Sequence, residues 1–191
     1  MTFIFEGMDN CLKDSIIQDL RSALSPTTQV LKFSNPPKRL NDPESYQKKH
    51  FKDMFDLIAL SVSQSDRNLI LNRAHLGEYV YSPIYRHYTA EWIFDLEKEF
   101  LSESKHSRTT ILILLYDSSN EQLRLREDGE SFSQASDEKL NSERQKFIEA
   151  FGKSLFPYKI KFDLADYFLE GHEMKRRVDT TLILEKIQSM L

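Results

Sequence analysis

Gly7 and Lys13 stand near the N-terminus at the spacing of a phosphate-binding loop. Such a loop runs from a strand into a helix and reads Gly, four residues, Gly, Lys, then Ser or Thr. Its backbone N–H groups surround phosphate oxygens, and its lysine reaches the outer phosphates. Leu12 occupies the second glycine position here, and Asp14 occupies the hydroxyl position. The pattern predicts a phosphate site, with a solvated surface lysine beside a turn glycine as the alternative.

A second group of candidate residues spans 72–86, directly after a short apolar segment at 68–71. It contains two arginines, Arg73 and Arg86, and three tyrosines. A guanidinium fork suits phosphate oxygens, and a tyrosine offers both a ring for stacking and a hydroxyl for hydrogen bonding. We expect a ligand-binding loop beside Gly7, and the alternative is an ordinary helix entry with aromatic core contacts.

A third group lies in the polar segment 117–139, which holds few apolar residues and many charges. We expect this segment to form a mobile surface excursion that adds nothing to the core. Arg124 and Arg126 lie within it. Arginines on such a flap can close over a transferring phosphate and neutralise its charge. A solvated charged loop is the alternative.

Apolar segments of two kinds alternate along the chain and would position these groups. Short runs rich in β-branched and apolar residues predict strands at 2–5, 28–33, 68–71, 109–116 and 158–162. Apolar residues at helical spacing predict helices at 13–24, 51–62, 90–101, 147–155 and 178–191. The alternation predicts an α/β fold with a parallel sheet covered on both faces. Ligands of such sheets bind at the carboxyl ends of the strands, where the candidate groups lie.

Length and composition narrow the class of protein. A chain of 191 residues suits a single domain. With 26 Lys+Arg against 30 Asp+Glu, the net charge of −4 argues against a general binder of nucleic acid or anionic membranes. No apolar run is long enough for a membrane span, and the N-terminus lacks the pattern of a signal peptide. The single cysteine, Cys11, excludes an internal disulfide and indicates a reducing compartment, the cytoplasm.

These motifs together resemble the thymidylate kinase family of P-loop nucleoside monophosphate kinases, most closely its phage-encoded members. The resemblance covers nearly the whole chain and rests on 3–10 with Lys13, on Asn72-Arg73 with Tyr81, and on 126–131 before a Glu-rich helix. It implies a three-layer P-loop kinase fold with a five-stranded parallel sheet flanked by helices and a mobile lid at about 117–139. It also implies a homodimer, located in the cytoplasm, or in the host cytoplasm if the chain is phage-encoded.

The activity that the resemblance implies is transfer of the γ-phosphoryl group of ATP, with Mg²⁺, to a deoxynucleoside monophosphate in dNTP synthesis. The acceptor would be dTMP or a modified pyrimidine monophosphate.

Residue roles follow from the same resemblance, position by position. The catalytic residues would be Lys13, Asp9, Arg73 and Arg126. The residues that bind ATP would be Gly7, Met8, Asp9, Asn10, Cys11, Leu12, Lys13, Asp14, Ser15 and Arg124. The residues that bind the acceptor substrate would be Asp9, Phe33, Phe51, Phe55, Arg73, Glu78, Tyr81 and Tyr85, although Phe51 and Phe55 could equally be core residues.

Three positions depart from the family pattern. Leu12 adds a side chain where the backbone must approach phosphate, and Asn72 replaces an aspartate. Asp14 replaces the hydroxyl residue that binds magnesium; its carboxylate is itself a suitable oxygen ligand, so we interpret Asp14 as a relocated metal ligand.

Two other functions stay open at this point. One is a catalytically impaired relative that binds a nucleotide or a partner. The other is a deoxynucleoside kinase, although the end of the second strand, 33–37, lacks the acid expected there.

Overall fold

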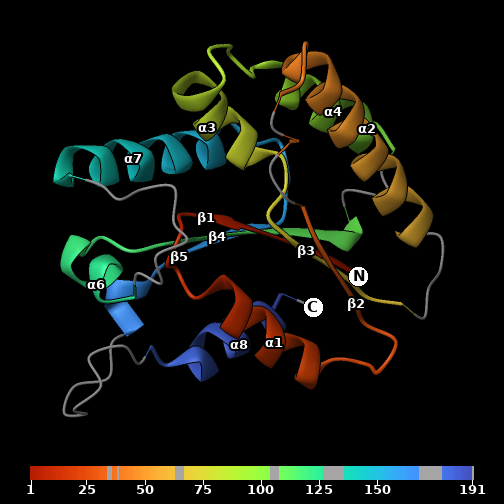
Figure 1. The fold of residues 1–191 in the computed structure, drawn as a ribbon. Helices are drawn as coiled ribbons and strands as arrows, with labels where there is room; N and C mark the ends of the chain where they lie inside the picture. Colours follow the sequence, from red (N-terminus) through yellow and green to blue (C-terminus); the bar gives the residue numbers. More distant parts are fainter. Residues whose placement is uncertain are drawn as a thin grey trace.

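The computed structural model describes residues 1–33, 36–37, 39–62, 67–103, 108–126, 136–167 and 178–190. Its centre is a five-stranded sheet in the order β2-β3-β1-β4-β5, with every paired strand parallel (Figure 1). The strands are β1 (Thr2–Gly7), β2 (Gln29–Lys32), β3 (Leu69–Asn72), β4 (Thr110–Tyr116) and β5 (Lys159–Asp163). The prediction of a parallel α/β sheet is confirmed.

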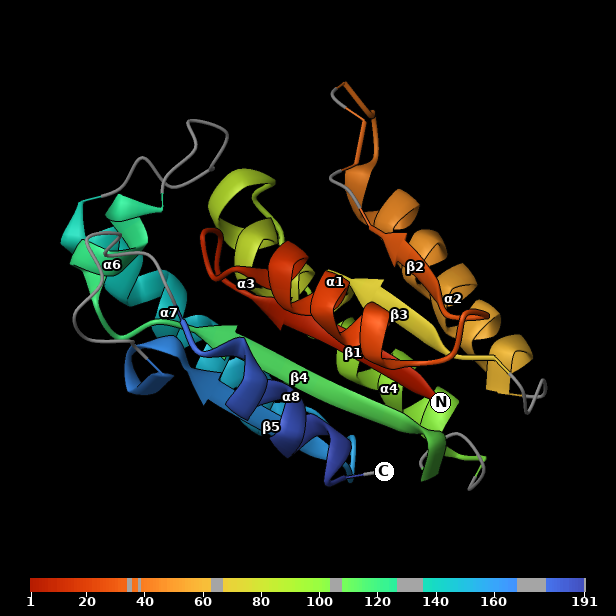
Figure 2. The same ribbon diagram turned by 90° about the horizontal axis from the view of Figure 1, so that it is seen from below.

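Helices cover both faces of this sheet and complete three layers (Figure 1). One face is covered by α2 (Pro43–Val62), α3 (Leu76–Tyr85), α4 (Trp92–Leu101) and α7 (Asp137–Lys153). Figure 2 shows the other face, covered by α1 (Lys13–Ala23) and α8 (Thr180–Gln188). Two short helices, α6 (Asn120–Leu125) and the 3-10 helix η1 (Leu164–Tyr167), follow β4 and β5. Within the described residues, no helix combines the length and the apolar character needed to span a membrane.

The three central strands explain why the sheet has this order. Every residue of β1 and β3 is buried, and six of the seven residues of β4 are buried as well. Strands that pack helices on both faces need such continuous apolar runs. Edge strands β2 and β5 keep exposed or half-buried residues. Because β1 pairs in parallel with both β3 and β4, the carboxyl ends of these three strands lie at one edge of the sheet.

Two expectations from the sequence were wrong. Residues 76–85 form the helix α3 rather than a loop, because Leu76 and Val80 lie one helical turn apart and are both fully buried. The segment 117–126 does contribute to the core, since Leu123 on α6 is buried. Its neighbour 127–135, the middle of the predicted lid, lies outside the described residues.

Gly7 ends β1 at a position where no other residue fits. Its φ is 137°, and a Cβ built on it would lie 1.8 Å from the carbonyl oxygen of Leu115, its partner on β4. Such a backbone conformation is essentially restricted to glycine, and the contact leaves no room for a side chain. The direction in which the chain leaves β1 toward α1 depends on this residue.

We expect Gly7→Ala to lower the free energy of unfolding by about 3 kcal/mol or more, because it adds both backbone strain and a clash with a strand. Gly152→Ala is the matched control: nothing lies within 4 Å of a Cβ there, and Gly152 is in the last turn of α7. The control should raise the free energy of unfolding slightly, since alanine favours helix. Urea unfolding of both variants measures the difference, and equal midpoints would contradict the prediction.

Candidate functional site

The loop between β1 and α1 folds around the ammonium group of Lys13. This group donates hydrogen bonds to the carbonyl oxygens of Gly7, at 2.9 Å, and of Met8. Lys13 is 6% exposed, and burial lowers the pKa of its ammonium group. Lys13 is therefore not a solvated surface lysine. Its charge is held inside the loop at the N-terminus of α1, where an anion would be stabilised by both the lysine and the helix.

The backbone of this loop contains two residues in the left-handed region. Asn10 has a φ of 62° and Leu12, the N-cap of α1, has a φ of 53°. Glycine takes this conformation freely, whereas a leucine there costs about 1–2 kcal/mol. Leu12 is half-buried and packs against the hydrophobic core, which offsets part of that cost. The leucine thus adopts the conformation that a glycine would provide at this place.

Cys11 lies between Asn10 and Leu12 and is buried. Burial raises the pKa of its thiol to about 12, so the group is uncharged at neutral pH.

An ion pair joins this loop to the end of β3. The Arg73 guanidinium donates to the Asp9 carboxylate through Nη2. Arg73 itself has a φ of 68°, and its side chain is 32% exposed. Burial opposes the charge of Arg73, but the charge and hydrogen bond of Asp9, together with Tyr81 and Glu6, outweigh burial and raise the pKa of the guanidinium. Arg73 is thus a fixed cation with part of its surface open to a ligand.

Arg73 lines an open pocket between β1, α2 and α3. The lining residues are Glu6, Gly7, Phe33, Gln47, Phe51, Arg73, Ala74, Gly77, Glu78, Tyr81, Arg86 and Phe147. The pocket therefore combines aromatic rings with a few polar and charged groups beside the β1–α1 loop, a composition typical of sites for small organic ligands.

Three residues predicted to bind the acceptor, Asp9, Phe55 and Tyr85, do not line this pocket. Asp9 instead pairs with Arg73, which does line it. Phe55 lies in the core, with its ring centroid 5.1 Å from those of His75 and Phe100, and it borders a separate cavity between α2 and α4. Tyr85 is half-exposed, with its ring 6.1 Å from that of Tyr81.

A buried carboxylate organises the polar side of the pocket. Glu78 accepts hydrogen bonds from Gln47 Nε2 at 2.7 Å, from Arg86 Nη1 at 2.8 Å and from the Tyr88 hydroxyl. Gln47 was not predicted, although it precedes Phe51 by one helical turn, a spacing that places both on one face of a helix.

A second buried carboxylate, that of Glu143 on α7, contacts Tyr81, which lines the pocket. The Tyr81 hydroxyl donates to Glu143 Oε1 at 2.5 Å. Burial raises the pKa of Glu143 and, with the Glu143 charge, raises that of Tyr81. The charges of Asp9, Lys13 and Arg73 also act on Glu143. Nothing in the sequence marks Glu143, because it lies among many other charged residues of a predicted helix.

Two oxygen-bearing side chains meet at the start of α1. Asn72 Nδ2 donates to Asp14 Oδ1, and Lys32 lies 3.4 Å from Asp14 Oδ2. The other amide atom, Asn72 Oδ1, is buried and has no hydrogen-bond partner within the described structure. Ser15, the next residue of α1, is exposed.

Arg126 lies at the loop rather than on an open flap. Its Nη1 donates to the Asn10 carbonyl at 3.0 Å, and its Nη2 donates to the buried Asp117 carboxylate. Arg124 is half-exposed and pairs with Asp137 at 2.5 Å. Arg126 therefore contacts the proposed phosphate loop directly, whereas Arg124 faces the start of α7.

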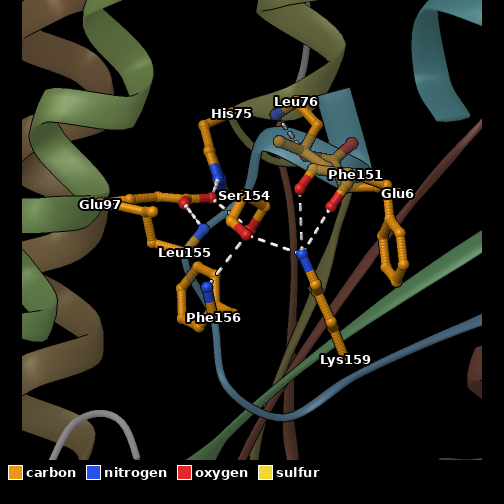
Figure 3. Close-up of polar contacts among 10 residues, drawn as sticks. Glu6, His75, Leu76, Glu97, Phe151, Ser154, Leu155, Phe156 and Lys159 are labelled. Carbon is orange, nitrogen blue, oxygen red and sulfur yellow. Dashed lines mark hydrogen bonds and ion pairs between the residues drawn. The ribbon is translucent and has the colours of Figure 1, made fainter. Parts of the chain in front are cut away.

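A buried polar network holds the connection between β3 and α3 (Figure 3). Glu6 Oε1 accepts from the Leu76 amide at 2.7 Å, and burial raises the pKa of Glu6. His75 Nε2 lies 2.5 Å from Glu97 Oε1. The same Glu97 oxygen accepts a hydrogen bond from Ser154 Oγ at 2.9 Å. This network ties the β3–α3 connection to β1, to α4 and to the segment after α7.

No protein-family model and no curated protein matches this chain in sequence. Solved structures do match in fold. The YorR protein from Bacillus subtilis, solved in complex with phosphorylated GDP, has a TM-score of 0.66 and 16% identity over 100% of this chain and 95% of its own. Thymidylate kinase from Candida albicans has a TM-score of 0.54 and 15% identity, covering 98% of this chain and 91% of its own.

Deoxyadenosine kinase from M. mycoides, solved with dCMP and dCDP, has a TM-score of 0.51 and 15% identity over 99% of this chain and 97% of its own. At such identities the likeness concerns the fold. The three-layer fold of P-loop nucleotide kinases, expected from the sequence, is thereby confirmed.

The buried Glu143 makes stability depend on pH in a defined direction. Its folded-state pKa is raised above the ordinary value of 4.5, so folding takes up a proton and stability falls as pH rises through the raised pKa. Glu143→Gln keeps an acceptor for Tyr81 and removes this dependence. We expect the stability of the variant relative to the wild type to rise as the pH rises above 4.5, measured by urea unfolding across the pH range.

Glu149→Gln is the control for this experiment. Glu149 is also on α7 and also accepts from a tyrosine hydroxyl, that of Tyr79 at 2.7 Å, but it is exposed and its pKa is lowered, chiefly by that hydrogen bond. Its replacement should shift stability only slightly and in the opposite direction. A Glu143→Gln advantage that is constant across the pH range would contradict the assigned titration.

Proposed function

We propose that this protein is a thymidylate kinase-like phosphotransferase that moves the γ-phosphoryl group of ATP to a deoxynucleoside monophosphate. One observation carries the proposal: the Asp9–Arg73 ion pair joins a loop that encloses a buried lysine to a pocket with aromatic walls. Phosphoryl transfer requires a donor phosphate site and an acceptor site side by side, and it depends mainly on positioning and electrostatics.

The β1–α1 loop is the proposed donor site. Lys13 and the backbone N–H groups at the start of α1 would hold the β- and γ-phosphates of ATP. Arg126, bonded to the Asn10 carbonyl, adds a further positive charge at this loop. Desolvation within the loop strengthens each of these interactions with an anion.

The pocket beside Arg73 is the proposed acceptor site. Arg73 would bind the acceptor phosphate, while Phe51 and Tyr81 contact the base and the sugar. An oxygen of the acceptor phosphate then attacks the γ-phosphorus; the new P–O bond forms as the bond to the β–γ bridging oxygen breaks, and ADP leaves. The acceptor oxygen is already anionic, so no residue of this chain has to remove a proton.

The chain also offers suitable oxygen ligands for the Mg²⁺ that such kinases require. Asp14 provides a carboxylate, and Asn72 Oδ1 is a buried acceptor without a hydrogen-bond partner among the described residues. Mg²⁺ is commonly held by one or two protein oxygens together with substrate phosphates, and it neutralises charge on the phosphates. Among the described residues, no group of three or more His, Cys, Asp or Glu side chains could hold a metal. An ion held by one or two protein oxygens and by substrate phosphates is consistent with this finding.

The ligands of the structural neighbours support this assignment. YorR was solved with phosphorylated GDP, and deoxyadenosine kinase was solved with dCMP and dCDP. The cytoplasmic location and the homodimer expected from the resemblance stay predictions.

Arg73→Ala should lower kcat/KM for the acceptor by about 100-fold or more, because it removes the charge that holds the acceptor phosphate. The measurement is ADP release with a panel of deoxynucleoside monophosphates. Arg21→Ala, which removes an exposed arginine of α1, is the control and should leave kcat/KM unchanged. An Arg73→Ala variant as active as the wild type would rule out the acceptor site.

The same assay, run with deoxynucleosides beside the monophosphates, separates the alternatives. Nucleotide binding without ADP release for any acceptor would identify a relative that has lost turnover. Release with nucleosides but not with monophosphates would identify a deoxynucleoside kinase.

Asp14→Ala should weaken Mn²⁺ binding to the protein–ATP complex by about tenfold, because it removes a carboxylate ligand. Electron paramagnetic resonance of Mn²⁺, which substitutes for Mg²⁺, measures this independently of activity. ATP binding without metal should be retained or tightened, since a negative charge near the phosphates is lost. Asp19→Ala on the same helix is the control. Unchanged Mn²⁺ affinity in Asp14→Ala would show that Asp14 is not a ligand.

A further inference from the structure

The side-chain amide of Gln47 leaves one buried acceptor unsatisfied beside the pocket. Gln47 is 2% exposed, and its Nε2 donates to Glu78 Oε2 at 2.7 Å. Its Oε1 is buried and has no hydrogen-bond partner in the described part of the chain. Buried polar atoms almost always have a partner, and leaving one without a partner is costly. Because Gln47 lines the pocket, a bound ligand can provide the missing donor.

Glu78 fixes which end of the Gln47 amide is available. An ionised carboxylate only accepts hydrogen bonds, so the Gln47 amide must present its NH₂ group to Glu78. Arg86 pairs with the same Glu78 oxygen at 2.8 Å, and the Tyr88 hydroxyl donates to the other oxygen, so both oxygens of Glu78 act as acceptors. Turning the Gln47 amide over would place oxygen against a carboxylate oxygen. The free end of the amide is therefore an acceptor in a fixed orientation.

The remaining pocket residues indicate which part of a ligand reaches Gln47. Phe51 lies one helical turn after Gln47 on α2, and both residues line the pocket. An aromatic ring that contacts the face of a heterocycle thus lies next to an amide that can contact its edge. Arg73 is the pocket's cation beside the β1–α1 loop, where the phosphate of a mononucleotide would lie.

We propose that Gln47 determines base specificity: its Oε1 accepts a hydrogen bond from an N–H on the hydrogen-bonding edge of the acceptor base. Glu78 is a positioning residue that acts through Gln47. This inference rests on the proposed function in so far as it places the acceptor nucleotide in this pocket. It adds the requirement that the base carry an N–H donor, since a base without one leaves Oε1 unpaired.

N-methylated nucleotides test this requirement by binding alone. The probes are whichever of dTMP, dCMP, dAMP and dGMP binds most tightly, and the same nucleotide with its edge N–H groups methylated, such as N3-methyl-dTMP or N6,N6-dimethyl-dAMP. Calorimetry gives the ratio of the two dissociation constants. We expect a ratio of about tenfold or more in the wild type. In Gln47→Ala, which removes the acceptor and makes room for the methyl group, the ratio should approach one.

Three further variants make the result specific. Gln18→Ala removes an exposed glutamine of α1 and should keep the wild-type ratio. Glu78→Gln should reduce the ratio, because a neutral amide at position 78 accepts either orientation of Gln47; a purely structural role of Glu78 would not change this ratio. Gln47→Leu preserves apolar volume and replaces Gln47→Ala if that variant fails to fold.

The outcomes separate this inference from the proposed function. A methylation ratio that is the same in Gln47→Ala and in the wild type would overturn the role of Gln47 and leave the acceptor pocket intact. Failure of all four monophosphates to bind the wild type would overturn the acceptor pocket and the inference together.

Discussion

The ion pair between Asp9 and Arg73 is the interaction on which the candidate site depends. It joins two loops that leave neighbouring parallel strands, and both residues are on segments with unusual backbone geometry. Gly7 lets the chain leave β1 without a clash, and Arg73 takes a positive φ directly after β3. The pair therefore fixes the distance between the lysine-containing loop and the pocket. Without it, these would be two separate features of the sheet edge.

Buried acidic residues surround this pair, and each has a specific donor. Glu6 accepts from the Leu76 amide, Glu78 from three side chains, and Glu143 from Tyr81. A buried carboxylate without donors would destabilise the fold. With donors it holds neighbouring groups in one orientation, which is what a ligand pocket requires. The pocket is thus organised by acids that do not themselves have to contact the substrate.

Much of the fold and part of the candidate site were accessible from the sequence. Apolar runs of the right length predicted all five strands, because a central parallel strand has to be apolar on both faces. The spacing of Gly7 and Lys13 predicted the loop after the first strand. Arg73 directly follows another predicted strand, so it was expected to lie near this loop. These inferences depend on local pattern and on the rule that parallel strands end at one edge of the sheet.

The remaining features depend on contacts between distant segments. Residues 76–85 contain tyrosines, a glycine and Pro83, which obscured the helical spacing of Leu76 and Val80. Gln47 and Glu78 are ordinary surface residue types, and only the folded chain brings them together in a buried hydrogen bond between α2 and α3. Arg126 appeared to belong to a charged excursion, but the buried Asp117 attracts it to the loop. Pairings of this kind leave no trace in either segment alone.

The state of Cys11 has a consequence for how the loop responds to its chemical environment. Oxidants and electrophiles react with the thiolate, and a buried thiol with a pKa of about 12 forms almost none at neutral pH. A reactive cysteine in the proposed phosphate loop would make ligand binding sensitive to peroxide. In this protein the same burial that packs the loop against the core keeps the thiol in its protonated, unreactive form.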